Sequence, residues 1–195
     1  MFEVLKSQGM QSNQQVIFLS DGGDTVRDSQ LYLNPNAEHL LDWFHLTMRL
    51  TVMRQKAKGL GVAGTELREI ALKELERIKW FLWHGNVFRA LETMNDLAMD
   101  LDTEEPTAKE ATLLKKLEEF DTYIRNNAGY IPNYGERRRY GETISTAFVE
   151  SAVNQVVSKR MVKNHQMRWN QQGAHLLLQV RTRVLNDVLR YVFRK

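Results

Sequence analysis

Cysteine is absent from the 195-residue chain, which excludes disulfide bonds and thiolate metal sites and allows a reducing compartment. Proline is scarce, with three residues. No apolar run approaches the ~20 residues that a membrane-spanning helix needs, and the N-terminus lacks the charged-then-apolar layout of a signal peptide. A hydrophobic fraction of 43% is ordinary for a globular chain with a core. We therefore expect a cytoplasmic protein with no membrane partner.

Charge is distributed unevenly along the chain. Residues 1–45 carry two Lys or Arg against six Asp or Glu, residues 46–131 carry thirteen against fourteen, and residues 132–195 carry twelve against four. A basic segment joined to an acidic one suits an enzyme of nucleic acids, in which positive surface holds phosphates and carboxylates hold metal ions. Solvated helix faces produce basic segments as well, so charge alone leaves both interpretations open.

A short apolar run, Val16–Leu19, leads through Ser20 into Asp21 and two glycines. This pattern is typical of a fully buried strand that ends in a turn. It predicts Asp21 at the carboxyl end of the strand, where open α/β sheets gather ligands and metals, although a turn capped by Asp21 explains the same residues. Residues 1–15 supply no strand neighbours, so we expect that another chain completes the sheet or that the N-terminal part of the domain is missing.

The next segment predicts mostly helices. Asp24–Ser29 indicate a polar turn, and Asn34–Asn36 indicate a boundary before a helix from about Ala37 to Lys58. Apolar stripes predict three amphipathic helices between Thr65 and Asn127, the last one opened by a capping box at Thr107 and Glu110. Three helices in succession with short breaks favour a bundle-like module.

The last third begins with a loop over residues 126–135 and a short β-prone stretch, residues 143–146. Ser145 or Thr146 is a candidate cap for a following helix that contains Glu150. Gln171–Gly173 predict a break before a final helix from Ala174 to about Phe193. The chain thus divides into residues 1–58, a helical insertion at 59–131, and residues 132–195.

Asp21 and Glu150 are the acidic residues whose context allows chemistry. Carboxylates that converge at a sheet edge can hold two divalent cations, which clamp the attacking and leaving oxygens of a phosphodiester. Glu150 interrupts an apolar run and needs a partner if it is buried. A glutamate in the first turn of a helix is also favoured by the helix dipole, so the residues alone leave both interpretations open.

Three blocks of the sequence together resemble a bacterial insertion-sequence transposase of the Kra type, within the DDE superfamily and related to Mutator-like elements. The blocks are Ser20–Asp24, Leu41–Arg49 and Ile144–Asn154, and the similarity extends to Met167–Trp169 and Gly173–Arg181. The resemblance implies an α/β, mainly helical chain: an incomplete ribonuclease-H-like core interrupted by an all-α insertion, with residues 1–58 and 132–195 as parts of the core.

The same resemblance implies the site and its chemistry. Asp21 matches the second catalytic acid and Glu150 the third, both as metal ligands, and Asp42 and His45 match a D-x-x-H motif beside the metals. The implied activity is DNA strand cleavage and transfer by two Mg²⁺ or Mn²⁺ ions, in a nucleoid-associated homo-oligomer. No residue before Val16 matches the first acid, so we expect a C-terminal portion of a transposase that is inactive alone. Without the resemblance, Asp42 and His45 would be interpreted as ordinary helix surface.

Basic and aromatic residues of the chain have two interpretations each. Candidate DNA contacts are Arg137, Arg138, Arg139, Lys159, Arg160 and Lys163; for the arginine run a solvated turn fits equally well. Trp80 and Trp83 suit stacking on an unpaired base, but packing among helices fits them better. Two further functions stay open: a non-catalytic DNA-binding remnant, and a metal-dependent hydrolase of small phosphoesters with a helical cap and a closed pocket beside Asp21.

Overall fold

The computed structural model describes residues 2–11, 14–60, 66–158 and 170–185. The fold is mixed α/β and mainly helical, with one small parallel sheet in the described ranges. The chain divides into two compact units, Met1–Thr146 and Ala147–Lys195. The sequence-predicted boundaries near residues 58 and 131 both fall inside the first unit.

The sheet consists of β1 (Ile17–Ser20) and β2 (Glu38–Leu41), paired in parallel so that Ile17 lies opposite Glu38 and Ser20 opposite Leu41. Helix α2 (Asp24–Leu33) connects them, and α1 (Phe2–Ser7) precedes them. The predicted polar turn at Asp24–Ser29 is therefore wrong, as is the predicted helix start near Ala37. The helix that we expected there begins after Asp42, which caps it, and the four residues before Asp42 pair with β1 instead.

Strand β1 is less buried than its apolar sequence predicted. Ser20 is buried, Phe18 and Leu19 are half-buried, and Ile17 is 39% exposed. The prediction of a fully buried strand is wrong because a sheet with two described strands covers too little of an apolar strand to remove it from water.

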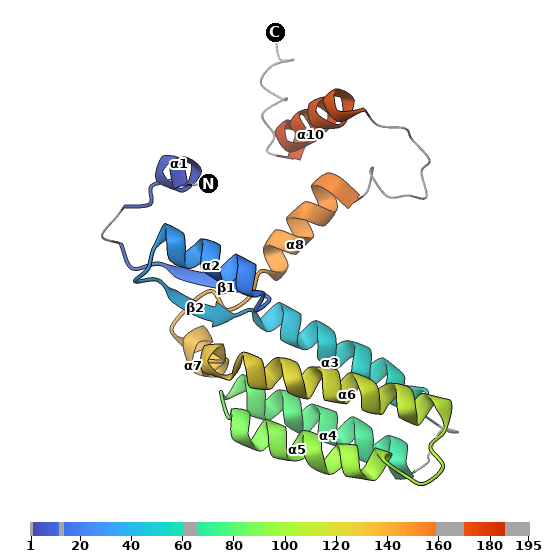
Figure 1. Cartoon of the computed structure of the whole chain (residues 1–195). Coiled ribbons are helices and arrows are strands. Elements are labelled where there is room, and N and C mark those ends of the chain that lie inside the picture. The colour runs from blue at the N-terminus through green and yellow to red at the C-terminus, as the bar shows by residue number, and fades with distance from the viewer. Residues whose placement is uncertain (1, 12–13, 61–65, 159–169, 186–195) are drawn as a thin grey trace. The chain divides into compact units, whose positions relative to one another are not determined.

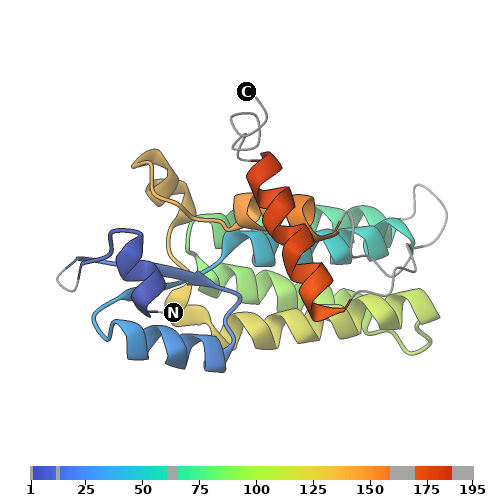
Figure 2. The same cartoon turned by 90° about the horizontal axis from the view of Figure 1, so that it is seen from above.

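Four helices form the bulk of the first unit: α3 (Trp43–Lys58), α4 (Glu66–Trp83), α5 (Val87–Leu101) and α6 (Ala108–Asn126). They lie side by side in the lower half of Figure 1 and along the length of Figure 2. The core contains residues of the predicted stripes, among them Leu75, Ile78, Met94, Leu117 and Phe120. The three predicted amphipathic helices are thus confirmed, and so is the capping box at Thr107 and Glu110.

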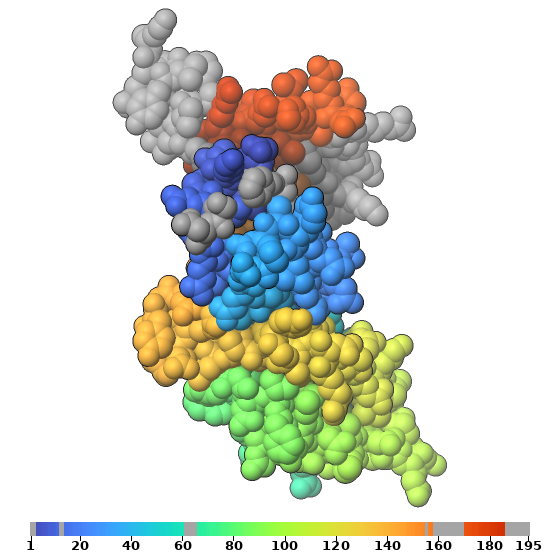
Figure 3. Space-filling view, turned by 60° about the vertical axis from the view of Figure 1, so that its left-hand side comes forward, coloured from blue at the N-terminus to red at the C-terminus, as the bar shows by residue number. Residues whose placement is uncertain are grey.

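After α6 the chain returns to the sheet. A short 3₁₀ turn, η1 (Ala128–Tyr130), is followed by α7 (Tyr134–Arg139), although the sequence predicted a loop up to Gly135. Tyr134 is fully buried, and its hydroxyl donates a hydrogen bond of 2.7 Å to the carbonyl oxygen of Leu41. This hydrogen bond joins the first residue of α7 to the last residue of β2. The blue α2–β2 segment and the yellow end of α6 lie against each other in the space-filling view of Figure 3.

The second unit contains α8 (Ala147–Val153), which continues into a π-helical turn, η2 (Asn154–Ser158), and α10 (Gln171–Leu185). The Arg181 Nε donates to the carbonyl oxygen of Val156 at 2.7 Å. The predicted break at Gln171–Gly173 is wrong: these residues form the first turn of α10, because the Asn170 side chain accepts from the Gly173 amide and starts the helix. Across the described ranges no helix has the length and apolar content to cross a membrane.

Candidate functional site

The parallel register places two of the predicted site residues at one edge of the sheet. Asp21 and Asp42 each come directly after the last paired residues, Ser20 and Leu41. The Asp42 amide donates to the Ser20 carbonyl oxygen at 2.8 Å and extends the ladder by one bond. Carboxyl ends of adjacent parallel strands are where α/β proteins place ligand-binding groups, so this edge is the candidate functional site.

Asp21 lies in a turn that the bundle holds in place. Its side chain is exposed, and one carboxylate oxygen accepts from the Gly23 amide at 3.2 Å. Its carbonyl oxygen accepts a hydrogen bond of 2.8 Å from the hydroxyl of Tyr123 in α6. Gly22 has φ of +88°, and a Cβ there would lie 2.5 Å from Oδ1 of Asn127. The turn is therefore fixed from the bundle side while the Asp21 carboxylate faces solvent.

A second set of contacts supports this turn from the sheet side. The Ser20 hydroxyl lies 3.1 Å from Nε2 of His39 and accepts from the Gly22 amide at 3.2 Å. Burial lowers the pKa of His39, and the charge of Arg27 adds to that effect. Arg27 donates to the Gly22 carbonyl oxygen at 3.1 Å and lies over the Tyr130 ring. His39 thus supports the turn from β2 through its contact with Ser20. In the sequence, His39 stands at no spacing that is typical of metal ligands.

Asp42 is a buried carboxylate surrounded by donors. Its side chain is fully buried, and Oδ1 accepts from the amides of Phe44 at 3.0 Å and Thr146 at 3.1 Å. Oδ2 accepts from the Thr146 hydroxyl and lies 3.7 Å from Nε2 of His45. A buried carboxylate needs such donors to offset its lost hydration. The D-x-x-H pair is thus in proximity, but Asp42 is the N-cap of α3, not a residue on its exposed surface.

The contacts of Asp42 give Thr146 a different role from the one that the sequence predicted. Thr146 was a candidate cap for the helix of Glu150, whereas its hydroxyl donates to Asp42. The Trp43 amide also donates to the Ile144 carbonyl oxygen at 3.2 Å. In the sequence, the signal for the cap that Asp42 forms is an aspartate directly before a helical run, which is the N-cap pattern.

Tyr123 and Arg49 complete the bundle side of the site. The Arg49 guanidinium lies 4.0 Å from the centre of the Tyr123 ring, a cation–π distance. Burial raises the pKa of Tyr123 to about 12, Arg49 opposes the shift, and the charges of Asp21 and Asp42 add to it. The Tyr123 hydroxyl thus keeps its proton at neutral pH and donates a hydrogen bond to the Asp21 carbonyl oxygen.

The metal ligands that the resemblance implied are only partly assembled by the first unit. Among the residues that the structure describes, no group of three His, Cys, Asp or Glu side chains could hold an ion. Asp21 offers an exposed carboxylate, whereas both carboxylate oxygens of Asp42 already accept hydrogen bonds from protein donors. Glu150 lies in α8 of the second unit and is half-buried. The described residues of the first unit thus bring together no group of three such ligands.

The predicted DNA contacts have different surroundings. Arg137 is half-buried and pairs with the carboxylates of Glu38 and Glu142, the latter at 2.8 Å. It joins α7 to the start of β2, and its interpretation as a DNA contact stays a prediction. Arg138 and Arg139 are exposed. Lys159, Arg160 and Lys163 lie outside the described residues.

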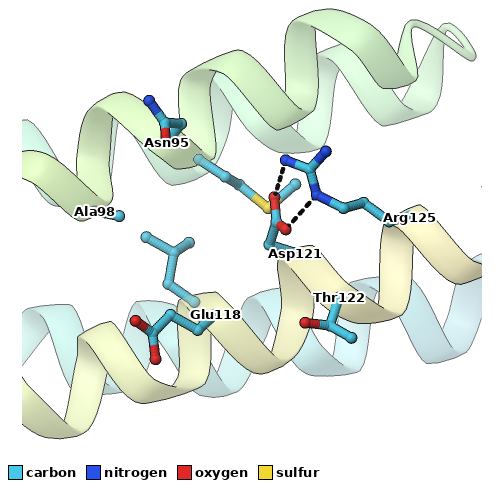
Figure 4. A pocket seen from close by; sticks show the side chains of 8 residues that line it. Asn95, Ala98, Glu118, Asp121, Thr122 and Arg125 are labelled. Atoms are coloured by element: carbon cyan, nitrogen blue, oxygen red, sulfur yellow. Dashed lines mark hydrogen bonds and ion pairs between the residues drawn. The ribbon is translucent and has the colours of Figure 1, made fainter.

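A cavity of the bundle lies away from the predicted site residues. It has a volume of about 360 Å³ between α5 and α6, and Figure 4 shows Glu118, Asp121 and Arg125 at its wall. The Arg125 guanidinium donates to both Asp121 oxygens, at 2.6 and 3.1 Å. Its charged lining groups are thus two acids and one arginine that pairs with one of them, so the cavity carries no excess of positive charge.

Comparison with known proteins adds no relative to this picture. No protein-family model, no curated protein and no solved structure matches the chain.

Proposed function

We propose that the chain is part of a DNA strand-cleavage and strand-transfer enzyme of the DDE transposase class, with Asp21 and Glu150 as its metal-binding carboxylates. The observation that carries the proposal is the hydrogen-bonded contact between Asp42 and Thr146. This contact joins the carboxyl end of β2, beside Asp21, to the residue directly before the helix of Glu150.

Chain geometry gives this contact its weight. Helix α8 begins at Ala147, directly after Thr146. Glu150 is four residues beyond Thr146, so it follows by about 6 Å along a helix axis that rises 1.5 Å per residue. The short separation in sequence between Glu150 and Thr146, which contacts Asp42, supports a shared role of Glu150 with Asp21.

The residues of this chain would divide the work as follows. Asp21 and Glu150 would supply oxygen ligands, which are those that Mg²⁺ and Mn²⁺ prefer. Asp42 would hold Thr146, the residue directly before α8, and Tyr123 would hold the Asp21 turn. When bound, two such ions activate a hydroxyl nucleophile and neutralise charge on a phosphodiester. Arg138 and Arg139 would contribute exposed charge for the DNA backbone.

Manganese binding by the full chain tests the proposal. Mn²⁺ would be titrated into the protein and free ion measured by electron paramagnetic resonance, with the variants Asp21→Asn and Glu150→Gln. We expect each variant to weaken Mn²⁺ binding about tenfold or more, because each removes a charged ligand. Asp28→Asn is the matched control, since Asp28 is exposed on α2, and should bind as the wild type does.

The double variant Asp21→Asn/Glu150→Gln separates a shared ion from two independent ions. If both carboxylates hold the same ion, the second substitution costs little after the first, because the effects of one site are not additive. Mn²⁺ affinity that Glu150→Gln leaves unchanged would contradict the proposal.

A further inference from the structure

The cavity of Figure 4 adjoins a second cavity, and together they form a groove between two helices of the bundle. The second cavity has a volume of about 480 Å³ and shares Asn95 and Arg125 with the first. Figure 4 shows Asn95 and Ala98 on α5 and Glu118 and Asp121 on α6. We call this surface the α5–α6 groove. A groove between two helices is a surface on which a further amphipathic helix can dock.

Apolar side chains line the α5–α6 groove. Phe88 is 67% exposed, Leu91 is half-buried, and Ala98 and Leu117 continue the apolar lining. Residues 88, 91, 95 and 98 recur every three or four positions, so they share one face of α5. A contiguous apolar surface that stays in water marks a site where a partner binds.

The charge of the groove is negative. Its acids are Glu92, Asp96, Glu118 and Asp121. Two arginines also line it, and each pairs with an acid of its own helix: Arg89 at 3.0 Å and Arg125 at 2.6 Å. The structure gives Asp96 on α5 and Glu118 on α6 no ion pair with any described residue. Uncompensated negative charge on both walls favours a positively charged partner.

Helix α10 has the complementary surface. Leu176, Val180 and Val184 recur every four residues, and all three side chains are exposed. Residues 171–185 contain no Asp or Glu, and Arg183 is exposed next to this stripe. From residue 171 to residue 195 the sequence has five Lys or Arg against one Asp. An apolar stripe flanked by positive charge matches an apolar groove with acidic walls.

We propose that the α5–α6 groove of one copy of this chain binds α10 of a second copy. The stripe of α10 would cover the apolar lining, and Arg183 would face the acids Asp96 and Glu118. Groove and helix belong to different units of the chain, so α10 can dock on another copy without leaving its own unit. Two copies can exchange this contact reciprocally and close a dimer. The inference does not involve Asp21 or Glu150 and therefore stands apart from the proposed function.

Sedimentation velocity of the full chain without DNA tests the proposal. We expect a monomer–dimer equilibrium that weakens as NaCl rises from about 50 to about 500 mM, because salt screens the opposite charges. Asp96→Lys/Glu118→Lys reverses the charge of the groove, and Arg183→Glu reverses that of the helix. Each variant should weaken dimerisation about tenfold or more, because like charges then face each other.

An equimolar mixture of these two variants gives the sharpest readout. In a mixed dimer each groove meets a helix of opposite charge, so the dissociation constant should return to within about threefold of the wild-type value. Restored association also shows that both variants are folded. Asp100→Lys is the matched control, since Asp100 is exposed on α5 outside the groove lining, and it should leave the equilibrium unchanged.

Three results would overturn the proposal: a wild-type chain that stays monomeric at every concentration, charge-reversed variants that dimerise as the wild type does, or a mixture that does not recover. A monomer whose sedimentation coefficient falls with Arg183→Glu would assign the groove to α10 of the same chain. A monomer that binds an added basic amphipathic peptide would assign it to another protein. Either assignment would contradict binding between two copies.

Discussion

Thr146 donates two hydrogen bonds to the buried carboxylate of Asp42, which lies 104 residues earlier in the chain. The carboxylate also caps α3. Asp42→Ala would leave these donors without their acceptor and remove the cap, so we expect a loss of about 3 kcal/mol in the free energy of unfolding. Thr146→Val removes the hydroxyl alone and should cost about 1 kcal/mol.

Urea denaturation followed by circular dichroism measures both losses. Thr146→Ser keeps the hydroxyl and serves as the matched control, with an expected change within about 0.5 kcal/mol. An Asp42→Ala protein as stable as the wild type would contradict the role assigned to this carboxylate.

Gly22→Ala should destabilise the Asp21 turn. The backbone there has φ of +88°, and the added Cβ would lie 2.5 Å from Oδ1 of Asn127. Backbone strain and overpacking together predict a loss of about 3 kcal/mol. Gly141→Ala is the control, because Gly141 has φ of +77° with nothing within 4 Å of its Cβ position, and strain alone should cost about 1 kcal/mol.

The contact with Asn127 gives a second readout for the same turn. In the double variant Gly22→Ala/Asn127→Ala the clash is absent, so its loss should be smaller than the sum of the two single losses. Strictly additive losses in thermal or urea unfolding would show that Asn127 does not limit the space at Gly22.

Alkaline pH should weaken the tie between α6 and the Asp21 turn. The pKa of Tyr123 is raised from 10 to about 12 by burial, so the folded state favours the neutral phenol. The resulting stability is fully present below pH 10 and is lost as the pH rises through 12. Because the side chain is only partly buried, we expect a contribution of about 1 kcal/mol.

The Tyr123→Phe variant isolates this contribution. The difference in free energy of unfolding between wild type and Tyr123→Phe should shrink between pH 10 and pH 12 and stay constant from pH 7 to pH 9. A difference that is constant across the whole range would mean that Tyr123 does not titrate in the way its burial implies.

Two arginines of α7 should differ in what their substitution changes: Arg137 should affect stability, and Arg139 should affect DNA binding. Arg137→Gln breaks the pairs with Glu38 and Glu142, and we expect a loss of about 1 kcal/mol in stability. Arg139→Gln changes an exposed side chain and should leave stability unchanged. If the proposed function holds, Arg139→Gln should weaken duplex DNA binding and reduce its salt dependence by about 0.9 in slope. Thermal melting and anisotropy at several salt concentrations check both effects.

The helical module was predictable from the sequence because its pattern is local. Apolar residues at helical spacing and the Thr107–Glu110 capping box are signals that lie within each helix, so they predict the helices without knowledge of the rest of the fold. The second helix also shows the limit: Leu91 is only partly buried, while Ala90 and Leu97 are in the core. A stripe predicts the face of a helix, but its neighbours decide which residues at the edges of that face are covered.

The sheet and much of the site could not be predicted in this way. Glu38–Leu41 carry no strong β pattern and form a strand because β1 pairs with them. Asp42 lies after a strand and before a helix, so its burial depends on Thr146, far along the chain. Tyr123 and Asn127 contact the Asp21 turn only once α6 has packed. Their contributions come from tertiary contacts that no window of sequence contains.

The separation of these contacts along the chain also bears on the order of folding. Helices α4, α5 and α6 follow one another with short connections, so their contacts close small loops, whereas Tyr123 meets Asp21 across 102 residues. Local contacts form first because they cost less chain entropy. We expect the bundle to collapse before the strand ends dock on it. In native-state hydrogen exchange, the amides of Gly22, Gly23 and Thr146 should exchange before those of the bundle core.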